Sequence, residues 1–124
     1  MKDPRLHLLH ILECVTRVRT YTVGGYTVFL DDVRTQDAVI RNFEMIGEAV
    51  KRLPERVRLA APDVPWRRLA GFRDVLIHQY DSVDVDEVWG AVENDLAVIE
   101  DGVKQALAAL DATAQTKEEP PGPV

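Results

Sequence analysis

The feature that most constrains the fold of this chain is a long run of apolar residues with helical spacing near its C-terminal end. From residue 85 to residue 110, apolar side chains recur every three or four positions over about seven helical turns. Asp84 and Glu87 stand three residues apart at its start, like a capping box with aspartate in the Ser/Thr place. A helix with one apolar stripe is stable only when other elements cover that stripe. We therefore expect a fold built around this helix.

Three more segments show the same periodicity. The expected helices span about 4–21, 32–53, 66–80 and 84–110, and residues 55–60 are expected to form a short helical turn. Asp3 and Pro4 fit the N-cap and the first position of a helix. Gly24-Gly25 and Pro54 mark helix ends. The stripe of the 32–53 segment contains Gly47, which costs helix propensity and so predicts a close crossing with another helix.

The stretch "YTVFLDDV" (26–33) is the one segment with some strand character. A single short strand cannot form a sheet, so this stretch is expected to be a loop leading into the next helix. The fold class predicted is therefore all-α, an up-and-down bundle of four to five helices. The expected domain is residues 1–111, followed by a disordered tail at 112–124, because "TAQTKEEPPGPV" is polar and rich in proline.

Bulk properties favour a cytoplasmic protein. The N-terminal stretch carries charges throughout, unlike a signal peptide, and no apolar run approaches the length of a membrane span. The single cysteine, Cys14, excludes an internal disulfide and a cysteine-based zinc site, and no histidine spacing points to a metal, so no cofactor is expected.

The net charge of −6 is unevenly distributed along the chain. Residues 51–73 hold 7 basic and 2 acidic side chains, whereas residues 74–124 hold 2 basic and 12 acidic ones. The basic segment, which includes Arg67 and Arg68, could be a solvated helical face, or it could attract phosphate and contact RNA weakly. The charge pattern alone leaves both interpretations open.

The segment "RDVLIHQY" (73–80) carries the most reactive side chains of the chain. His78 can exchange protons near neutral pH, Asp74 could hydrogen-bond its ring, and the Arg73 fork matches a phosphate. A proton shuttle beside a phosphate-binding group is what metal-free RNA cleavage requires. By spacing alone, a histidine and an arginine on one helix are more often a polar pair at the edge of a core than catalytic residues. Glu44 and Glu48, with Arg41 and Lys51 near them, are most simply surface ion pairs.

A resemblance to a known family favours the chemical interpretation. "RDVLIHQY" fits R-x4-H-x-Y and resembles the signature of HepT-like proteins in the HEPN superfamily. "AVIRNFEMIGEAVKRLP" (38–54) is similar to the family's second helix. "VPWRRLAGFRDVLIHQYDSVDVDEVW" (64–89) is similar to its third helix, the following loop and the start of the fourth. The resemblance covers residues 1 to about 110.

The resemblance implies a HEPN-like homodimer that places two such motifs in one cleft. It implies a metal-independent ribonuclease toxin of a toxin–antitoxin pair, with Arg73 and His78 catalytic and Asp74 in a supporting position where the family often has asparagine. The partner would be a minimal nucleotidyltransferase antitoxin of the MntA type. That enzyme would bind ATP and transfer AMP to Tyr80 (AMPylation). The alternative is a non-catalytic helical subunit that binds and regulates the nucleotidyltransferase.

Overall fold

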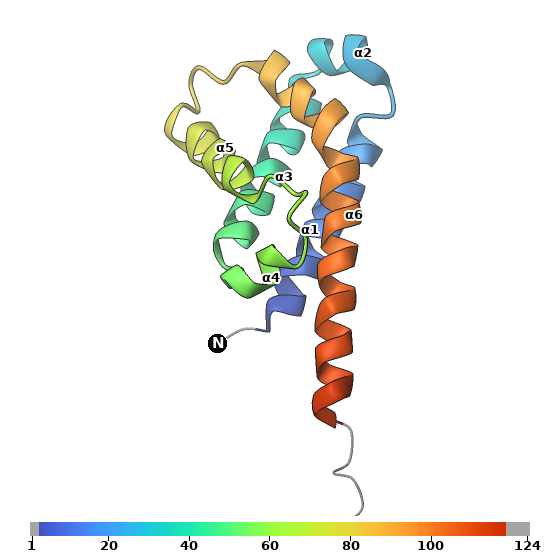
Figure 1. Ribbon diagram of the computed structural model, residues 1–124. Helices are drawn as coiled ribbons and strands as arrows, with labels where there is room; N and C mark the ends of the chain where they lie inside the picture. The colour runs from blue at the N-terminus through green and yellow to red at the C-terminus, as the bar shows by residue number, and fades with distance from the viewer. Residues whose placement is uncertain (1–2, 119–124) are drawn as a thin grey trace, which may run out of the picture.

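The computed structural model describes residues 3–118, and the described part of the chain is helical without strands (Figure 1). This confirms the all-α class. The helices are α1 (Pro4–Tyr21), α2 (Gly25–Asp31), α3 (Val33–Lys51), α4 (Glu55–Leu59), α5 (Trp66–His78) and α6 (Val85–Glu118). Four of them match the predicted long helices, and α4 matches the predicted short turn. No helix within residues 3–118 combines the length and the apolar character needed to cross a membrane.

[FIG1]

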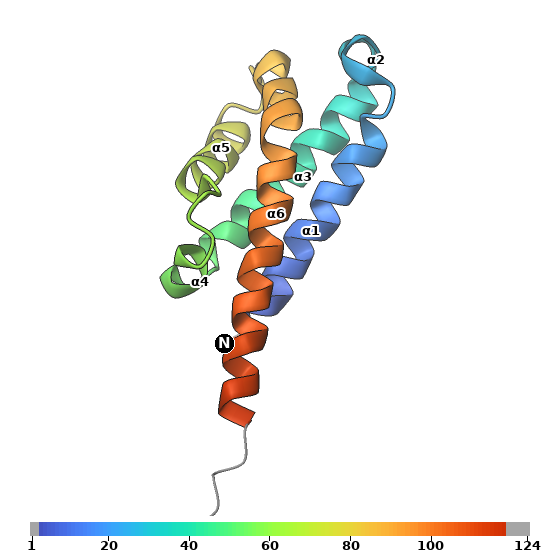
Figure 2. The same ribbon diagram turned by 45° about the vertical axis from the view of Figure 1, so that its right-hand side comes forward.

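[FIG2]

The long helices α1, α3 and α6 lie side by side, and α5 packs on α3 away from α1 (Figures 1 and 2). Their facing stripes form one core. Its largest fully buried side chains are Phe29, Phe43, Leu8, Ile11, Ile46, Leu76, Ile99, Val15, Val18, Val39, Val50 and Val88. Because α5 rests mainly on α3, a groove remains between α5 and α6.

Side-chain caps fix where the helices begin. The Asp3 carboxylate accepts a hydrogen bond from the Arg5 amide at 2.9 Å, with Pro4 in the first turn as predicted. Asp32 accepts from the amides of Arg34 and Thr35 at the start of α3. At α5 the anchor is tertiary, because the buried Trp66 indole donates to backbone carbonyl groups of the α4 region.

The prediction of a loop at residues 26–33 was wrong for most of that stretch, because residues up to Asp31 form α2. Gly25 starts this helix with a φ of 85°, a conformation that favours glycine. Phe29 is buried, and its ring lies 5.2 Å from that of Trp89 on α6. The Tyr26 hydroxyl donates to Asp86 at 2.6 Å. Contacts with residues sixty positions away therefore stabilise a helix that is too short to form alone.

The predicted start of a disordered tail at residue 112 was also wrong, since α6 continues to Glu118. The last turns of α6 extend past the other helices (Figure 1). Propagation of an existing helix adds one hydrogen bond for each residue that it fixes, so a helix can continue beyond the segment that its neighbours cover. Residues 119–124, the rest of the predicted tail, lie outside the described residues.

Candidate functional site

The position of Arg73 is set by the crossing of α5 over α3 at Gly47. A Cβ atom added to Gly47 would lie within 3.0 Å of the Arg73 Cβ and Cγ atoms, and 2.9 Å from the Leu69 carbonyl oxygen. Such distances are shorter than real side chains tolerate, so only glycine allows the two helices to approach this closely. The close crossing predicted from Gly47 is confirmed, and it occurs at the first residue of the R-x4-H-x-Y motif.

The Arg73 guanidinium is held by two carboxylates. Its Nη1 donates to Asp74 at 2.9 Å, and its Nη2 pairs with Glu48 at 3.1 Å. Its Nε is buried and has no hydrogen-bond partner among the described residues. The side chain is 25% exposed, and those of Glu48 and Asp74 are 41% and 43% exposed. Water reaches both carboxylates, so these ion pairs are weak enough for an incoming anion to replace them.

Asp74 is shared between two cations. Its Oδ1 atom also accepts from the Lys51 ammonium at 2.5 Å. The hydrogen bond from Lys51, and then that from Arg73, lower the pKa of the Asp74 carboxyl. Within residues 3–118, the expected hydrogen bond between the His78 ring and the Asp74 carboxylate is not formed. Asp74 instead links the start of the motif to the end of α3.

Arg73 lines a polar groove formed by α1, α3 and α5, with a volume of about 340 Å³. We call it the Arg73 groove. It is lined by His7, His10, Arg41, Glu44, Met45, Glu48, Ala49, Arg52, Arg73 and Ile77. Glu48 bridges two cations here, because it also pairs with Arg52 at 3.1 Å. The groove therefore combines three guanidinium groups and two imidazoles with two carboxylates.

His78 is the last residue of α5 and is exposed; it does not line the Arg73 groove. It follows Arg73 by five positions, which places the two side chains about 140° apart around the helix. Tyr80 follows the end of the helix and is 82% exposed. A single chain therefore presents Arg73 and His78 in different directions.

Tyr80 lines a smaller groove of about 220 Å³, which we call the Tyr80 groove. Its lining is Asp37, Ile40, Arg41, Glu44, Leu76, Tyr80 and Val83. The arginine in this groove is Arg41, not Arg73. Arg41 is a residue that the sequence analysis assigned to a surface ion pair.

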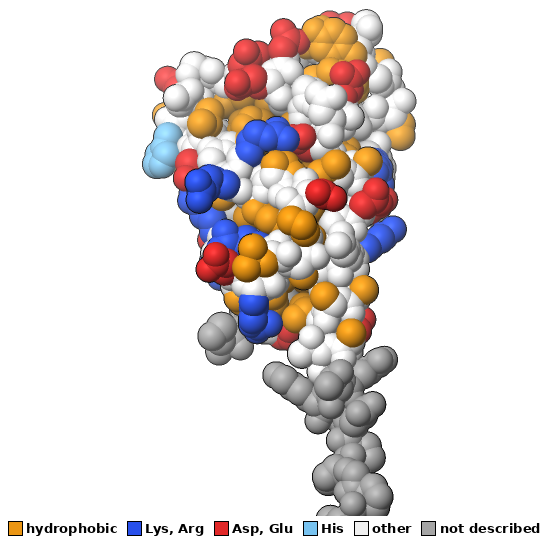
Figure 3. Space-filling view, in the orientation of Figure 1, with side chains coloured by type: hydrophobic (Ala, Val, Ile, Leu, Met, Phe, Trp, Pro, Cys, Tyr) orange, Lys and Arg blue, Asp and Glu red, His pale blue; other side chains and the backbone are white. Residues whose placement is uncertain are grey.

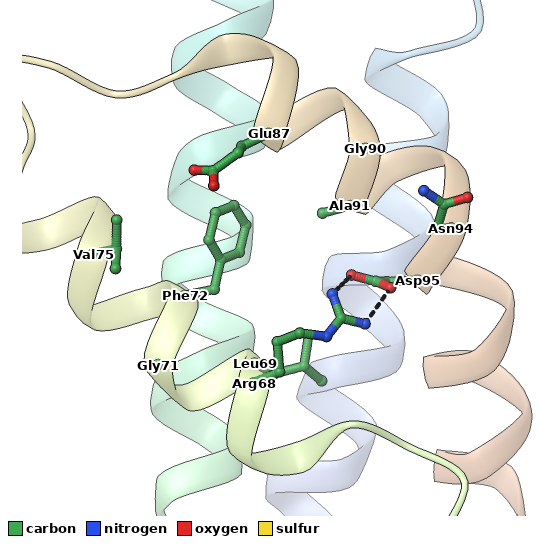
Figure 4. Close-up of a pocket in the computed structure, with 10 residues that line it drawn as sticks. All are labelled: Arg68, Leu69, Gly71, Phe72, Val75, Glu87, Gly90, Ala91, Asn94 and Asp95. Carbon is green, nitrogen blue, oxygen red and sulfur yellow. Dashed lines mark hydrogen bonds and ion pairs between the residues drawn. The ribbon is translucent and has the colours of Figure 1, made fainter.

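Arg68 lies on the opposite side of α5, in the groove between α5 and α6 (Figure 4). Its Nη1 and Nη2 atoms donate to the two oxygens of Asp95 at 2.9 and 2.7 Å, and the Asp95 hydrogen bonds raise the pKa of Arg68. Asp95 is 4% exposed. The whole groove has a volume of about 830 Å³, and the rest of its lining is largely apolar, with Leu69, Phe72, Val75 and Ala91. Arg68, predicted as a weak RNA contact, thus neutralises a buried carboxylate.

[FIG4]

Arg67 is exposed near the start of α5. Figure 3 shows Lys and Arg side chains gathered on the face where α4 and α5 lie, whereas Asp and Glu side chains gather at the end where α6 begins. The uneven charge of the sequence is therefore also uneven on the surface. Among residues 3–118, no group of three or more His, Cys, Asp or Glu side chains is placed to hold a metal ion.

[FIG3]

The sequence analysis missed Arg41, Arg52, His7 and His10 as neighbours of the motif. On α3 a signal existed, because polar residues at 41, 44, 48 and 52 recur every three or four positions and so share one helical face. The expected ion pair of Arg41 with Glu44 is present, with 3.7 Å between its charged atoms. Nothing local in the sequence indicates that this face meets Arg73.

Comparisons with known proteins identify the family of this chain. A family model described as "Ribonuclease HepT-like" matches residues 11–106. A Thermococcus cleftensis protein named "Probable ribonuclease HepT" is 48% identical over 91 residues, covering 73% of this chain and 83% of that protein. A Methanocaldococcus jannaschii protein named "Putative RNase" is 42% identical over 108 residues, covering 83% of this chain and 89% of that protein.

A longer relative from the same archaeon is named "Gamma-glutamylcyclotransferase and putative RNase". It is 36% identical over 120 residues, covering 94% of this chain but only 53% of that protein. This chain therefore spans about half the length of that relative. No solved structure was found to match the chain.

Proposed function

Since the chain belongs to the HepT-like ribonuclease family, we propose that it is a metal-independent endoribonuclease and the toxin of a toxin–antitoxin pair. It acts in the cytoplasm as a homodimer, and a minimal nucleotidyltransferase antitoxin of the MntA type neutralises it. The family match and the ribonuclease names of its relatives support the enzymatic class. The mechanism depends on one observation about Arg73. This residue packs closely against Gly47, lines a groove, and forms ion pairs with carboxylates that water can reach.

The proposed reaction uses one proton acceptor, one proton donor and one cation. His78 accepts the proton of a ribose 2′-hydroxyl as the 2′ oxygen bonds to phosphorus. The bond from phosphorus to the 5′ oxygen breaks, and that oxygen receives a proton, which leaves a cyclic phosphate and a 5′-hydroxyl. The Arg73 guanidinium stabilises the negative charge that develops on the phosphoryl oxygens. To do so, it exchanges Glu48 or Asp74 for the phosphate.

A homodimer supplies what one protomer lacks. Arg73 and His78 point in different directions on α5 of one chain, and each chain carries one motif histidine. In a two-fold dimer with α5 near the axis, two copies of His78 are available, one to accept a proton and one to donate it. Val75 and Ile77 are exposed apolar residues at this end of α5, which suits such an interface.

Tyr80 is the proposed site of AMP transfer. Its hydroxyl lies on a side chain that is 82% exposed, just beyond the end of α5, where a second enzyme can reach it. In the transfer, the tyrosyl oxygen bonds to the α-phosphorus of ATP, pyrophosphate leaves, and the phenolic proton is released. The added phosphate and base would occupy the Tyr80 groove beside Arg41.

The rival function is a non-catalytic subunit that binds and regulates the nucleotidyltransferase. One observation favours it, namely that both terminal nitrogens of Arg73 are already paired with carboxylates. The apolar groove between α5 and α6 also offers a surface for a protein partner. The two functions differ in whether the purified protein cleaves RNA.

Expression without the antitoxin separates the two functions. Wild type should arrest growth and deplete RNA, whereas His78→Ala should do neither, and purified wild type should cleave RNA equally with and without EDTA. Activity lost in EDTA and restored by magnesium would contradict the metal-free mechanism. No cleavage in any condition would favour the binding subunit.

A further inference from the structure

The Arg73 groove and the Tyr80 groove meet at two residues. Arg41 and Glu44, one turn apart on α3, line both of them. The two grooves therefore adjoin at Arg41 and Glu44, with the two α1 histidines and Arg73 in one lining and Tyr80 in the other. A flexible strand that enters at one end must pass Arg41 to reach the other.

Arg41 is held more loosely than the other arginines that form contacts near the motif. Its nearest carboxylate, that of Glu44, is 3.7 Å away, beyond hydrogen-bond distance, and the Arg41 side chain is 68% exposed. Arg52, Arg68 and Arg73 instead make ion pairs of 2.7 to 3.1 Å. Arg41 can therefore turn its guanidinium toward an anion without breaking a hydrogen bond.

Carboxylates line both grooves, so an RNA strand that follows them needs a cation where the grooves adjoin. Asp37, Glu44 and Glu48 line the two grooves and repel a phosphate backbone. Arg73 offsets this repulsion at one groove only. Between the grooves, Arg41 is the guanidinium group common to both linings.

We propose that Arg41 binds an RNA phosphate next to the one held by Arg73, so that the strand lies along both grooves. This inference rests on the proposed ribonuclease function and specifies the route of its substrate. It also gives AMP transfer a direct effect: a tyrosyl-AMP is itself a phosphodiester, and at Tyr80 it lies where the RNA phosphate would bind Arg41. The modification then blocks the path of the strand as well as adding charge.

The test measures RNA binding in a His78→Ala parent, which is expected not to cut its ligand. A fluorescently labelled single-stranded RNA of mixed sequence is titrated at several KCl concentrations, with anisotropy as the readout. Arg41→Gln removes the proposed contact, and Arg41→Lys keeps the charge. The matched control is Arg56→Gln, which removes the same charge from an exposed position on α4, outside both grooves.

Arg41→Gln should weaken RNA binding about fivefold at moderate salt and reduce the slope of log affinity against log salt by about 0.7, the value for one phosphate contact to a single strand. Arg41→Lys should restore most of that slope. Arg56→Gln should change affinity less than about twofold, because only the general field is altered. Melting temperatures should match the parent, since both side chains are exposed.

Equal effects of Arg41→Gln and Arg56→Gln would overturn the inference, because net charge alone would then explain binding. In that case, RNA binding by the parent that still depends on Arg73 leaves the proposed function intact. A parent that binds no RNA overturns both the inference and the proposed function.

Discussion

Two arginines on the same helix, five residues apart, have opposite environments. Arg68 makes two short parallel hydrogen bonds to one carboxylate, Asp95, which is 4% exposed. Arg73 divides its guanidinium between Glu48 and Asp74, which are 41% and 43% exposed. A buried carboxylate needs its cation, whereas carboxylates in contact with water can lose theirs at little cost. Breaking the Arg68–Asp95 pair therefore costs more than breaking those of Arg73, although the Arg68 side chain itself is 62% exposed and that of Arg73 only 25%.

This difference shows why a basic residue near a motif is a poor guide to function until its partner is known. Both arginines belong to the basic segment 51–73, and both match phosphate by their chemistry. The burial of the partner carboxylate decides which of the two is available to a ligand. The predictions below test this distinction in order of expected effect.

Arg73→Ala should reduce RNA cleavage about 100-fold or more, as expected when a cation that stabilises transition-state charge is removed. The free energy of unfolding should change by less than about 1 kcal/mol, because the lost ion pairs are accessible to water and alanine keeps the Cβ that contacts Gly47. Cleavage rates and urea denaturation measure the two effects. A large loss of stability with normal cleavage would mean that Arg73, and not only Arg68, has a structural role.

Arg68→Ala should lower the free energy of unfolding by about 1–3 kcal/mol, because the buried Asp95 loses its hydrogen-bond donors. Cleavage at a temperature where the variant is folded should be close to normal. The double variant with Asp95→Asn should recover part of the loss, since no buried charge then remains. Additive losses in the double variant would show that the pair is not coupled.

Gly47→Ala should destabilise the protein by about 1–3 kcal/mol by forcing α5 away from α3. Gly71→Ala is the matched control, because a Cβ at Gly71 of α5 meets nothing within 4 Å. It should instead gain up to about 1 kcal/mol from helix propensity. Equal effects at the two glycines would mean that the close crossing does not constrain Arg73.

Asp74→Asn should produce the smallest change in stability of the four variants, a slightly lower melting temperature, and mainly at pH values above 3.8. The pKa of Asp74 is lowered from its usual 3.8, so its ion pairs stabilise the folded state above that value. The carboxyl of the unfolded chain takes up its proton near the usual pKa of 3.8, and that of the folded protein only at a lower pH. The contribution of the ion pairs to stability is therefore lost as the pH falls from 3.8 through the lowered pKa of the folded state. Wild type should therefore melt slightly above Asp74→Asn at pH 6, and the difference should be smaller at pH 3, with thermal unfolding followed by circular dichroism. A difference that is the same at both pH values would contradict this role of the carboxylate.

Much of this protein could be predicted from its sequence, because helix formation is decided by neighbours within about one turn. The apolar periodicity, Pro4 and Pro54 correctly placed the long helices. Gly47 correctly predicted a close crossing, since a glycine in a helical stripe leaves room for another backbone. The R-x4-H-x-Y spacing, together with the similar segments 38–54 and 64–89 around it, was sufficient to identify the family.

Only the tertiary structure decided which side chains meet. The partners of the motif lie far along the chain: Glu48 and Lys51 reach Arg73 and Asp74 from α3, and Asp95 reaches Arg68 from α6. Helix α2 likewise depends on Trp89. A sequence pattern gives the direction of a side chain around its own helix, but the crossing angle and separation of two helices determine what that side chain touches. For this reason the sequence identified Arg73 and His78 as candidates, whereas the carboxylates around Arg73 and the path past Arg41 emerged from the packing of α3 against α5.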